Sequence, residues 1–307
     1  MNKRLNKKRM KTIPLLVLII IMVGLSFLLG RQSVAAQKRS TQENTIASSS
    51  SSATKIVTAT SASSSVTPTF YITGSGGTAH PLDRLIEGMF PTLNPQKDCL
   101  NLQVDISKND KLTVSGSINP LDKTPIIEFA TVKGTISGEI YAKAIKVAMD
   151  YLVSKYHYQA INLVGYSSGG TGAIYYMMDY ANVANLPKVK KYLSLDGEYN
   201  TEAHFQVGET LTSLLTNGPI LKTPMYDYIA SHYSQINPET QIYLLEGNWN
   251  TAEQTDGAIP WADTFSIYHL LMANKNPVSI YLYPTQYKHG RVVLEPLVQN
   301  YIKKIIY

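Results

Sequence analysis

Residues 161–170 run Ile-Asn-Leu-Val-Gly-Tyr-Ser-Ser-Gly-Gly, an apolar stretch that passes directly into glycine and serine. The apolar residues predict a buried strand, and the pattern of 169–182 predicts a helix directly after it. The sequence therefore places a Gly-x-Ser-x-Gly motif, centred on Ser167, at a turn from strand to helix. So tight a turn forces the serine into a strained backbone conformation, and glycines at 165 and 169 avoid collisions with it.

Segments with strand and helix patterns alternate on both sides of this motif. The predicted helices cover 138–156, 169–182, 260–274 and 291–305, and the predicted strands cover 70–73, 101–106, 111–115, 126–130, 161–164, 190–195, 241–245 and 278–283. This alternation predicts the α/β class, with a mostly parallel central sheet covered by helices on both faces. Residues 200–238 interrupt the alternation, and we expect them to form a small cap-like insert.

The position of Ser167 makes it the expected nucleophile. At the N-terminus of a helix, the helix dipole and free N–H groups favour a developing negative charge. A serine hydroxyl is a weak nucleophile and needs a general base. In this type of fold the serine is followed along the chain by an acid and then by a histidine. His289, in a loop after the strand 278–283, is the expected base, whereas His269 lies inside a predicted helix and is expected to be structural.

The acid is expected after one of the late strands. Asp256 follows the strand 241–245, where its carboxylate would orient the imidazole and stabilise the imidazolium. Asp196, after the strand 190–195, is the alternative. Asp263 is a third choice and is expected to face solvent from a helix.

An oxyanion hole requires two backbone N–H groups that point at one oxygen. We expect one from Ser168, next to the nucleophile, and one from Ser75, in the glycine-rich stretch 73–77 after the first strand. This stretch is not a dinucleotide-binding fingerprint, because residue 79, where a third glycine would be needed, is alanine.

The net charge of +6 comes from the start of the chain. Residues 1–68 contain ten basic residues and one acid, which leaves 18 basic and 21 acidic residues in 69–307. The folded part is thus mildly acidic, and its charge gives no support for nucleic-acid binding.

The N-terminus has the pattern of an export signal. Six positive charges at 3–11 precede an apolar run at 13–30, which predicts a signal peptide or membrane anchor over 1–36. Residues 37–68 are rich in Ser and Thr and predict a disordered linker. The positive-inside rule places the domain 69–307 outside the membrane, either anchored or secreted.

Cys99 is the single cysteine of the chain. One cysteine forms no internal disulfide and no zinc–thiolate cluster, so we expect a structural thiol. The motifs call for no metal and no organic cofactor.

The chain resembles the cell-surface α/β hydrolases of Gram-positive bacteria, a family without a firm substrate. The resemblance covers about 69–307 and rests on Tyr71–Thr78, Asn162–Gly170, Thr255–Pro260 and Lys288–Gly290. It implies the α/β-hydrolase fold and a triad of Ser167, Asp256 and His289. The chain departs from the family at Thr73-Gly74, where His-Gly is usual, and at Tyr166 and Ser168, where His and Met are usual.

These features predict a serine hydrolase that cleaves carboxylic esters, with thioesters or amides as further options, and a small or lipid-like ester as substrate. An acyltransferase would use the same residues, with an alcohol in place of water. A non-catalytic binding module on the same fold is the alternative from another class.

Overall fold

The computed structural model describes residues 66–180 and 183–307. The expected leader at 1–36 and most of the expected linker at 37–68 lie outside the described residues. Within the described ranges, no helix is both long and apolar enough to cross a membrane.

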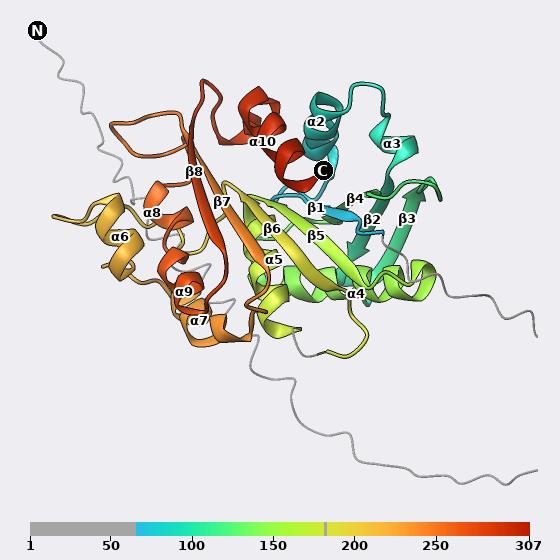
Figure 1. Cartoon of the computed structure of the whole chain (residues 1–307), viewed down its shortest axis with the longest axis horizontal. Coiled ribbons are helices and arrows are strands. Elements are labelled where there is room, and N and C mark those ends of the chain that lie inside the picture. The colour runs from blue at the N-terminus through green and yellow to red at the C-terminus, as the bar shows by residue number, and fades with distance from the viewer. Residues whose placement is uncertain (1–65, 181–182) are drawn as a thin grey trace, which may run out of the picture. The chain divides into compact units, whose positions relative to one another are not determined.

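An eight-stranded sheet, with strand order β3-β2-β4-β1-β5-β6-β7-β8, organises the described residues (Figure 1). Every pairing is parallel except the antiparallel pair of β2 and β3. The strands predicted at 101–106 and 111–115 thus form an antiparallel hairpin at one edge of the sheet. The strands are β1 Thr69–Ile72, β2 Leu100–Asp105, β3 Lys111–Gly116, β4 Ile126–Thr131, β5 Ala160–Tyr166, β6 Lys188–Leu195, β7 Gln241–Asn248 and β8 Val278–Pro284.

Helices cover both faces of the sheet, as predicted. On one face α4 (Gly138–Tyr156) and α5 (Ser168–Asp179) pack over a large core that includes Phe70, Leu163 and Tyr192. The other face carries α2 (His80–Met89), the 3-10 helix η3 (His289–Leu294) and α10 (Pro296–Ile306) over a smaller core. Figure 1 shows α2 and α10 on the opposite side of the sheet from α4. Both faces of the central strands are thus buried, which explains their continuous apolar sequences.

Two predicted helices differ from the structure. The helix expected at 260–274 is two short helices, α8 (Trp261–Thr264) and α9 (Tyr268–Ala273). Between them, the buried side chain of Ser266 donates back to the carbonyl of Asp263 at 2.7 Å, a local bond that competes with continuous helix.

The last helix begins at Pro296 instead of 291, because Glu295 caps its N-terminus and Pro296 is well suited to the first turn. The residues before it form η3, which begins at His289. His289 was predicted to lie in a loop, and that prediction is wrong. Sequence analysis also missed α2 and the short helix α3 (Pro95–Asp98).

The insert at 200–238 contains α6 (Leu211–Asn217), α7 (Pro224–His232) and the 3-10 helix η2 (Tyr233–Gln235). Helix α7 packs against α5, whereas α6 packs against α8 and α9. The insert therefore extends the helical layer on the α5 side of the sheet.

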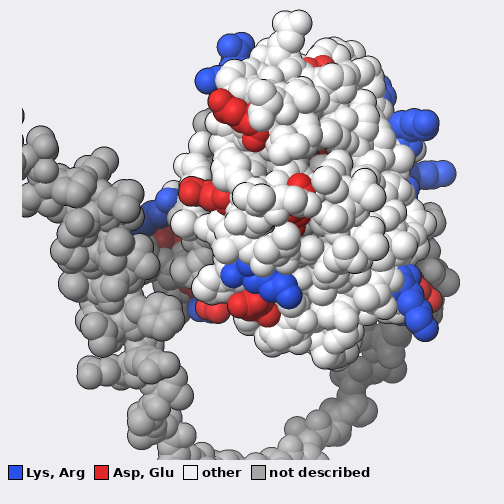
Figure 2. Space-filling model, turned by 90° about the vertical axis from the view of Figure 1, so that its left-hand side faces the viewer, with Lys and Arg blue, Asp and Glu red and all other residues white. Residues whose placement is uncertain are grey.

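The carboxyl ends of β6 and β7 point to the left in Figure 1, and that side faces the viewer in Figure 2. Uncharged residues make up most of this face. Acidic and basic side chains are scattered over it, and neither sign gathers into a large patch.

Candidate functional site

Ser167 occupies the single residue between β5 and α5. Its backbone has φ 55° and ψ −134°, a conformation that residues other than glycine rarely adopt. The N–H of Ser167 donates to the carbonyl oxygen of Leu195 at 2.9 Å, which ties the turn to β6. The predicted strain at the serine is therefore present, and neighbouring strands hold it in place.

The two glycines of the motif lie where no side chain fits. A methyl group on Gly165 would lie 2.6 Å from the Cα atom of Gly170, and one on Gly169 would lie 2.4 Å from the carbonyl oxygen of Thr73. Both contacts are with backbone, which cannot rotate away as a side chain can. The two glycines are thus required by the close packing of α5 against the ends of β5 and β1.

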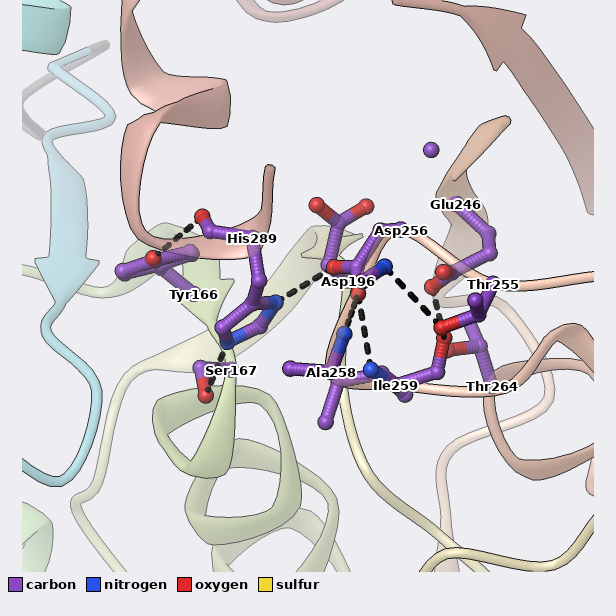
Figure 3. Close-up of polar contacts among 12 residues, drawn as sticks. Tyr166, Ser167, Asp196, Glu246, Thr255, Asp256, Ala258, Ile259, Thr264 and His289 are labelled. Carbon is purple, nitrogen blue, oxygen red and sulfur yellow. Dashed lines mark hydrogen bonds and ion pairs between the residues drawn. The ribbon is translucent and has the colours of Figure 1, made fainter. Parts of the chain in front are cut away.

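His289 lies beside Ser167, although 122 residues separate them in the chain. Its Nε2 is 2.9 Å from the Oγ of Ser167 (Figure 3). The phenol of Tyr166 donates to the carbonyl oxygen of His289 at 2.7 Å, and the Tyr166 ring stacks on the imidazole with centroids 5.3 Å apart. The ring is therefore held on one face by the residue that precedes the serine.

Asp256 completes a chain of hydrogen bonds on the far side of the imidazole. Its side chain is fully buried, and its Oδ2 accepts from Nδ1 of His289. Its Oδ1 accepts from the backbone N–H groups of Ala258 at 2.9 Å and Ile259 at 2.7 Å. With Nδ1 bonded to a carboxylate, the proton of a neutral imidazole belongs on Nδ1, and Nε2 is free to accept from the serine hydroxyl.

The other two candidate acids do not contact the imidazole as Asp256 does. Asp196 is fully buried behind Asp256, where its carboxyl accepts from the phenol of Tyr283 at 2.8 and 2.9 Å. Asp263 is also fully buried, so the prediction that it faces solvent is wrong. Its carboxylate accepts from three backbone N–H groups of the chain after β6, at Tyr199, Asn200 and Glu202.

The glycine-rich stretch after β1 lies against the serine. A methyl group on Gly74 would lie 3.0 Å from Cβ of Ser167. The buried phenol of Tyr141, on α4, is 2.6 Å from the carbonyl oxygen of Thr73 and 2.8 Å from that of Gly74. Because C=O and N–H of a trans peptide point in opposite directions, the N–H of Ser75 is directed away from Tyr141.

The second expected oxyanion donor lies on the helix. Ser168 is the first residue of α5, and the N–H groups of a first helical turn have no partner within the helix. Its backbone N–H is thus available beside Ser167.

Besides Tyr141, sequence analysis missed the roles of two further residues near this centre. Tyr166 bonds and stacks on His289. Its position next to Ser167 in the serine motif was the signal in the sequence that could have indicated this role. Glu198, after β6, is half-buried; burial raises the pKa of its carboxyl, and the nearby His289 opposes that shift.

Among the described residues, Asp196, Asp256 and His289 form a group that could hold a metal ion, because their potential ligand atoms lie within 4.8 Å of one another. The hydrogen bonds described above already engage these atoms. Cys99 is fully buried, and burial raises the pKa of its thiol to about 12, which disfavours the reactive thiolate.

The arrangement can therefore carry out nucleophilic catalysis. It combines a hydroxyl on a strained turn, an imidazole at hydrogen-bond distance from that hydroxyl, and a buried carboxylate on the far side of the imidazole.

Residues 57–307 match the family model described as "Alpha/beta hydrolase of unknown function (DUF915)". No protein with a curated description matches the chain. Among solved structures, the product of the gene lin2722 of Listeria innocua is similar, with 21% identity, a TM-score of 0.67, and coverage of 79% of this chain and 95% of that chain. A "putative cell surface hydrolase" from Lactobacillus plantarum WCFS1 is similar with 18% identity, a TM-score of 0.57, and coverage of 78% and 90%.

At these identities the solved structures show the fold alone. Together with the family match and the strand order, they establish the α/β-hydrolase fold that the resemblance implied.

The contact at Gly169 yields a prediction about stability. Alanine normally stabilises a helix relative to glycine, but a methyl group here would collide with the carbonyl oxygen of Thr73. We expect Gly169→Ala to lower the free energy of unfolding by about 1–3 kcal/mol in urea titrations followed by tryptophan fluorescence. Gly76→Ala is the control, because a methyl group there meets no atom within 4 Å. Equal stability of the two variants would contradict the predicted collision.

Proposed function

Because the chain belongs to the family of α/β hydrolases of unknown function (DUF915), we propose that it is a serine hydrolase that cleaves carboxylic esters through an acyl-enzyme on Ser167. One observation carries the proposal: the hydroxyl of Ser167 lies 2.9 Å from His289 Nε2, while Nδ1 of the same ring bonds the buried carboxylate of Asp256. A nucleophile, a base and a group that orients the base are the requirements of acyl transfer.

In the first half of the proposed reaction, Oγ of Ser167 attacks the ester carbonyl and its proton passes to Nε2 of His289. The carboxylate of Asp256 stabilises the resulting imidazolium and holds its orientation. The imidazolium then donates the proton to the leaving alcohol, and the acyl group remains on the serine. In the second half, His289 removes a proton from water, which attacks the acyl-enzyme. The imidazolium then returns the proton to Oγ of Ser167 as the acid is released.

The oxygen of the carbonyl becomes negatively charged in both halves. The N–H of Ser168 and the N–H of Ser75 are the proposed donors to it. The bonds from Tyr141 to the carbonyl groups of Thr73 and Gly74 support this role of Ser75, because they set the orientation of the peptide that carries its N–H. Both donors are backbone groups, so the departures from the family at residues 73, 166 and 168 leave this part of the mechanism intact.

The substrate is proposed to be an uncharged ester. The face toward which β6 and β7 point has no large patch of either charge (Figure 2), and such a surface neither attracts nor repels ionic substrates strongly. The N-terminal pattern of positive charges and apolar residues supports a location outside the membrane, anchored or secreted. One structural neighbour carries the name of a cell surface hydrolase, which agrees with this proposal.

A fluorophosphonate probe tests the nucleophile directly. We expect the probe to label the wild-type chain and Ser168→Ala, but not Ser167→Ala, because it reacts with an activated serine hydroxyl. Gel fluorescence and mass spectrometry of the labelled peptide measure the outcome. A folded wild-type protein that resists the probe would point instead to a binding module on this fold.

The base is tested by His289→Ala, with His269→Ala as the control. We expect His289→Ala to reduce kcat for a chromogenic ester by at least about 10³-fold with a small change in Tm, since its side chain is partly exposed and serves chemistry. His269, on α9, bonds Tyr226 and the carbonyl of Ser266, so its loss should leave kcat nearly unchanged. Similar kcat values for the two variants would remove His289 from the mechanism.

The phenol of Tyr141 is tested by Tyr141→Phe. We expect kcat to fall by about tenfold while KM changes little, because the loosened peptide no longer aims the Ser75 N–H at the transition state. Tyr71→Phe is the matched control: Tyr71 is also fully buried, but it packs in the core on the other face of the sheet and its phenol bonds Tyr307 at 3.1 Å. If both variants lose kcat equally, the effect is a general consequence of a lost buried hydroxyl.

A further inference from the structure

The interior behind His289 contains a second aspartate that the proposed mechanism leaves without a role. Asp196 follows β6, has no exposed surface and adopts φ 49°. Its carboxyl and that of Asp256 lie beside each other, and donor atoms of both fall within 4.8 Å of a ring nitrogen of His289 (Figure 3). Two carboxyls therefore face one imidazole in a region without access to water.

The surroundings of this pair do not favour two negative charges. The titratable groups that face it are Tyr166 from β5, Glu198 after β6, Glu246 from β7, Tyr283 from β8 and His289 from η3. Among the described residues, His289 is the only basic group that forms an ion pair with either aspartate. Neighbouring buried carboxyls without further positive charge share one proton.

The hydrogen bonds indicate which aspartate keeps that proton. Asp256 accepts from two backbone N–H groups and from His289, three donors that stabilise its ionised form. Asp196 has fewer donors: the phenol of Tyr283, shared between its two oxygens, and the backbone N–H of Gly247. Burial and the charge of Asp256 raise the pKa of the Asp196 carboxyl well above its ordinary value.

We propose that Asp196 is a positioning residue that stays protonated and donates its O–H to the carboxylate of Asp256, so that His289 faces one negative charge instead of two. The role of Asp196 in catalysis rests on the proposed function of the chain as a serine hydrolase. The bond holds the Asp256 carboxylate toward Nδ1 of His289.

Infrared spectroscopy of the full chain tests the protonation state without any assay of activity. Incorporation of aspartate labelled with ¹³C in its side-chain carboxyl shifts the bands of aspartates alone. The buried Glu128 on β4 and Glu246 on β7, whose pKa burial raises, therefore do not interfere. At about pH 8.5 Asp263, with a pKa of about 7, is mostly ionised. We expect one protonated aspartate band that persists at this pH and is absent from Asp196→Asn. A spectrum with no such band in the wild type would overturn the proposal.

Kinetics of two asparagine variants test the role of the proton. Asn tolerates the positive φ of residue 196, has the shape of a protonated Asp and retains a donor. We expect Asp196→Asn to keep kcat within about threefold of the wild type and to leave the acid limb of the kcat/KM profile in place. Asp256→Asn should lose about 10³- to 10⁴-fold. A loss of this size in Asp196→Asn, or a shift of its acid limb to lower pH, would mean that Asp196 carries the charge.

Asp196→Gly removes the donor and also tolerates positive φ. We expect it to lower kcat by about tenfold with little change in KM, because the Asp256 carboxylate is less well oriented. Unchanged kcat in this variant would contradict a positioning role. The two proposals fail separately: absent fluorophosphonate labelling would end the hydrolase proposal, while the infrared band would still decide whether Asp196 is protonated.

Discussion

The left-handed backbone at Ser167 is the constraint on which the rest of the site depends. A residue with φ 55° is unfavourable for serine and persists only when its surroundings leave no alternative. Here β5 ends one residue before it, α5 begins one residue after it, and its N–H is bonded to β6. This geometry directs the hydroxyl away from the sheet and toward His289. It also brings the first turn of α5 so close to β1 that residue 169 has room for no side chain.

Backbone hydrogen bonds and buried acids hold the groups around the serine in place. Asp256 is fixed by two N–H groups of its own loop, and the N–H of His289 donates to the Asp256 carbonyl at 2.9 Å. Asp263 joins α8 to the chain after β6 in a similar way. Carboxylates are suited to this task because each offers several acceptor positions to N–H groups that would otherwise be buried without partners. Burial raises the pKa of the Asp196 and Glu246 carboxyls, which are bonded by fewer N–H groups.

The errors of the sequence analysis have a common physical origin. Asp263 has the sequence context of a solvated helix, yet three N–H groups from residues 199–202 draw it into the interior. Tyr166 occupies an unspecified position of the serine motif, and its contact with His289 spans 123 residues. Both roles arise from partners that lie far away along the chain, and local composition contains no information about them.

The alternation of strands and helices, the mostly parallel sheet and the placement of Ser167 between β5 and α5 could be predicted from the sequence. These features follow from local physics: apolar periodicity selects strand or helix, and glycines mark the turn where side chains cannot fit. Long-range packing selects Asp256 over Asp196 as the partner of the imidazole, and it brings Tyr141 and Tyr166 to the backbone that they orient. Those outcomes depend on the packing of β1, β5, β6, β7 and β8 against their helices, because residues that no pattern links along the chain become neighbours only when the sheet is assembled.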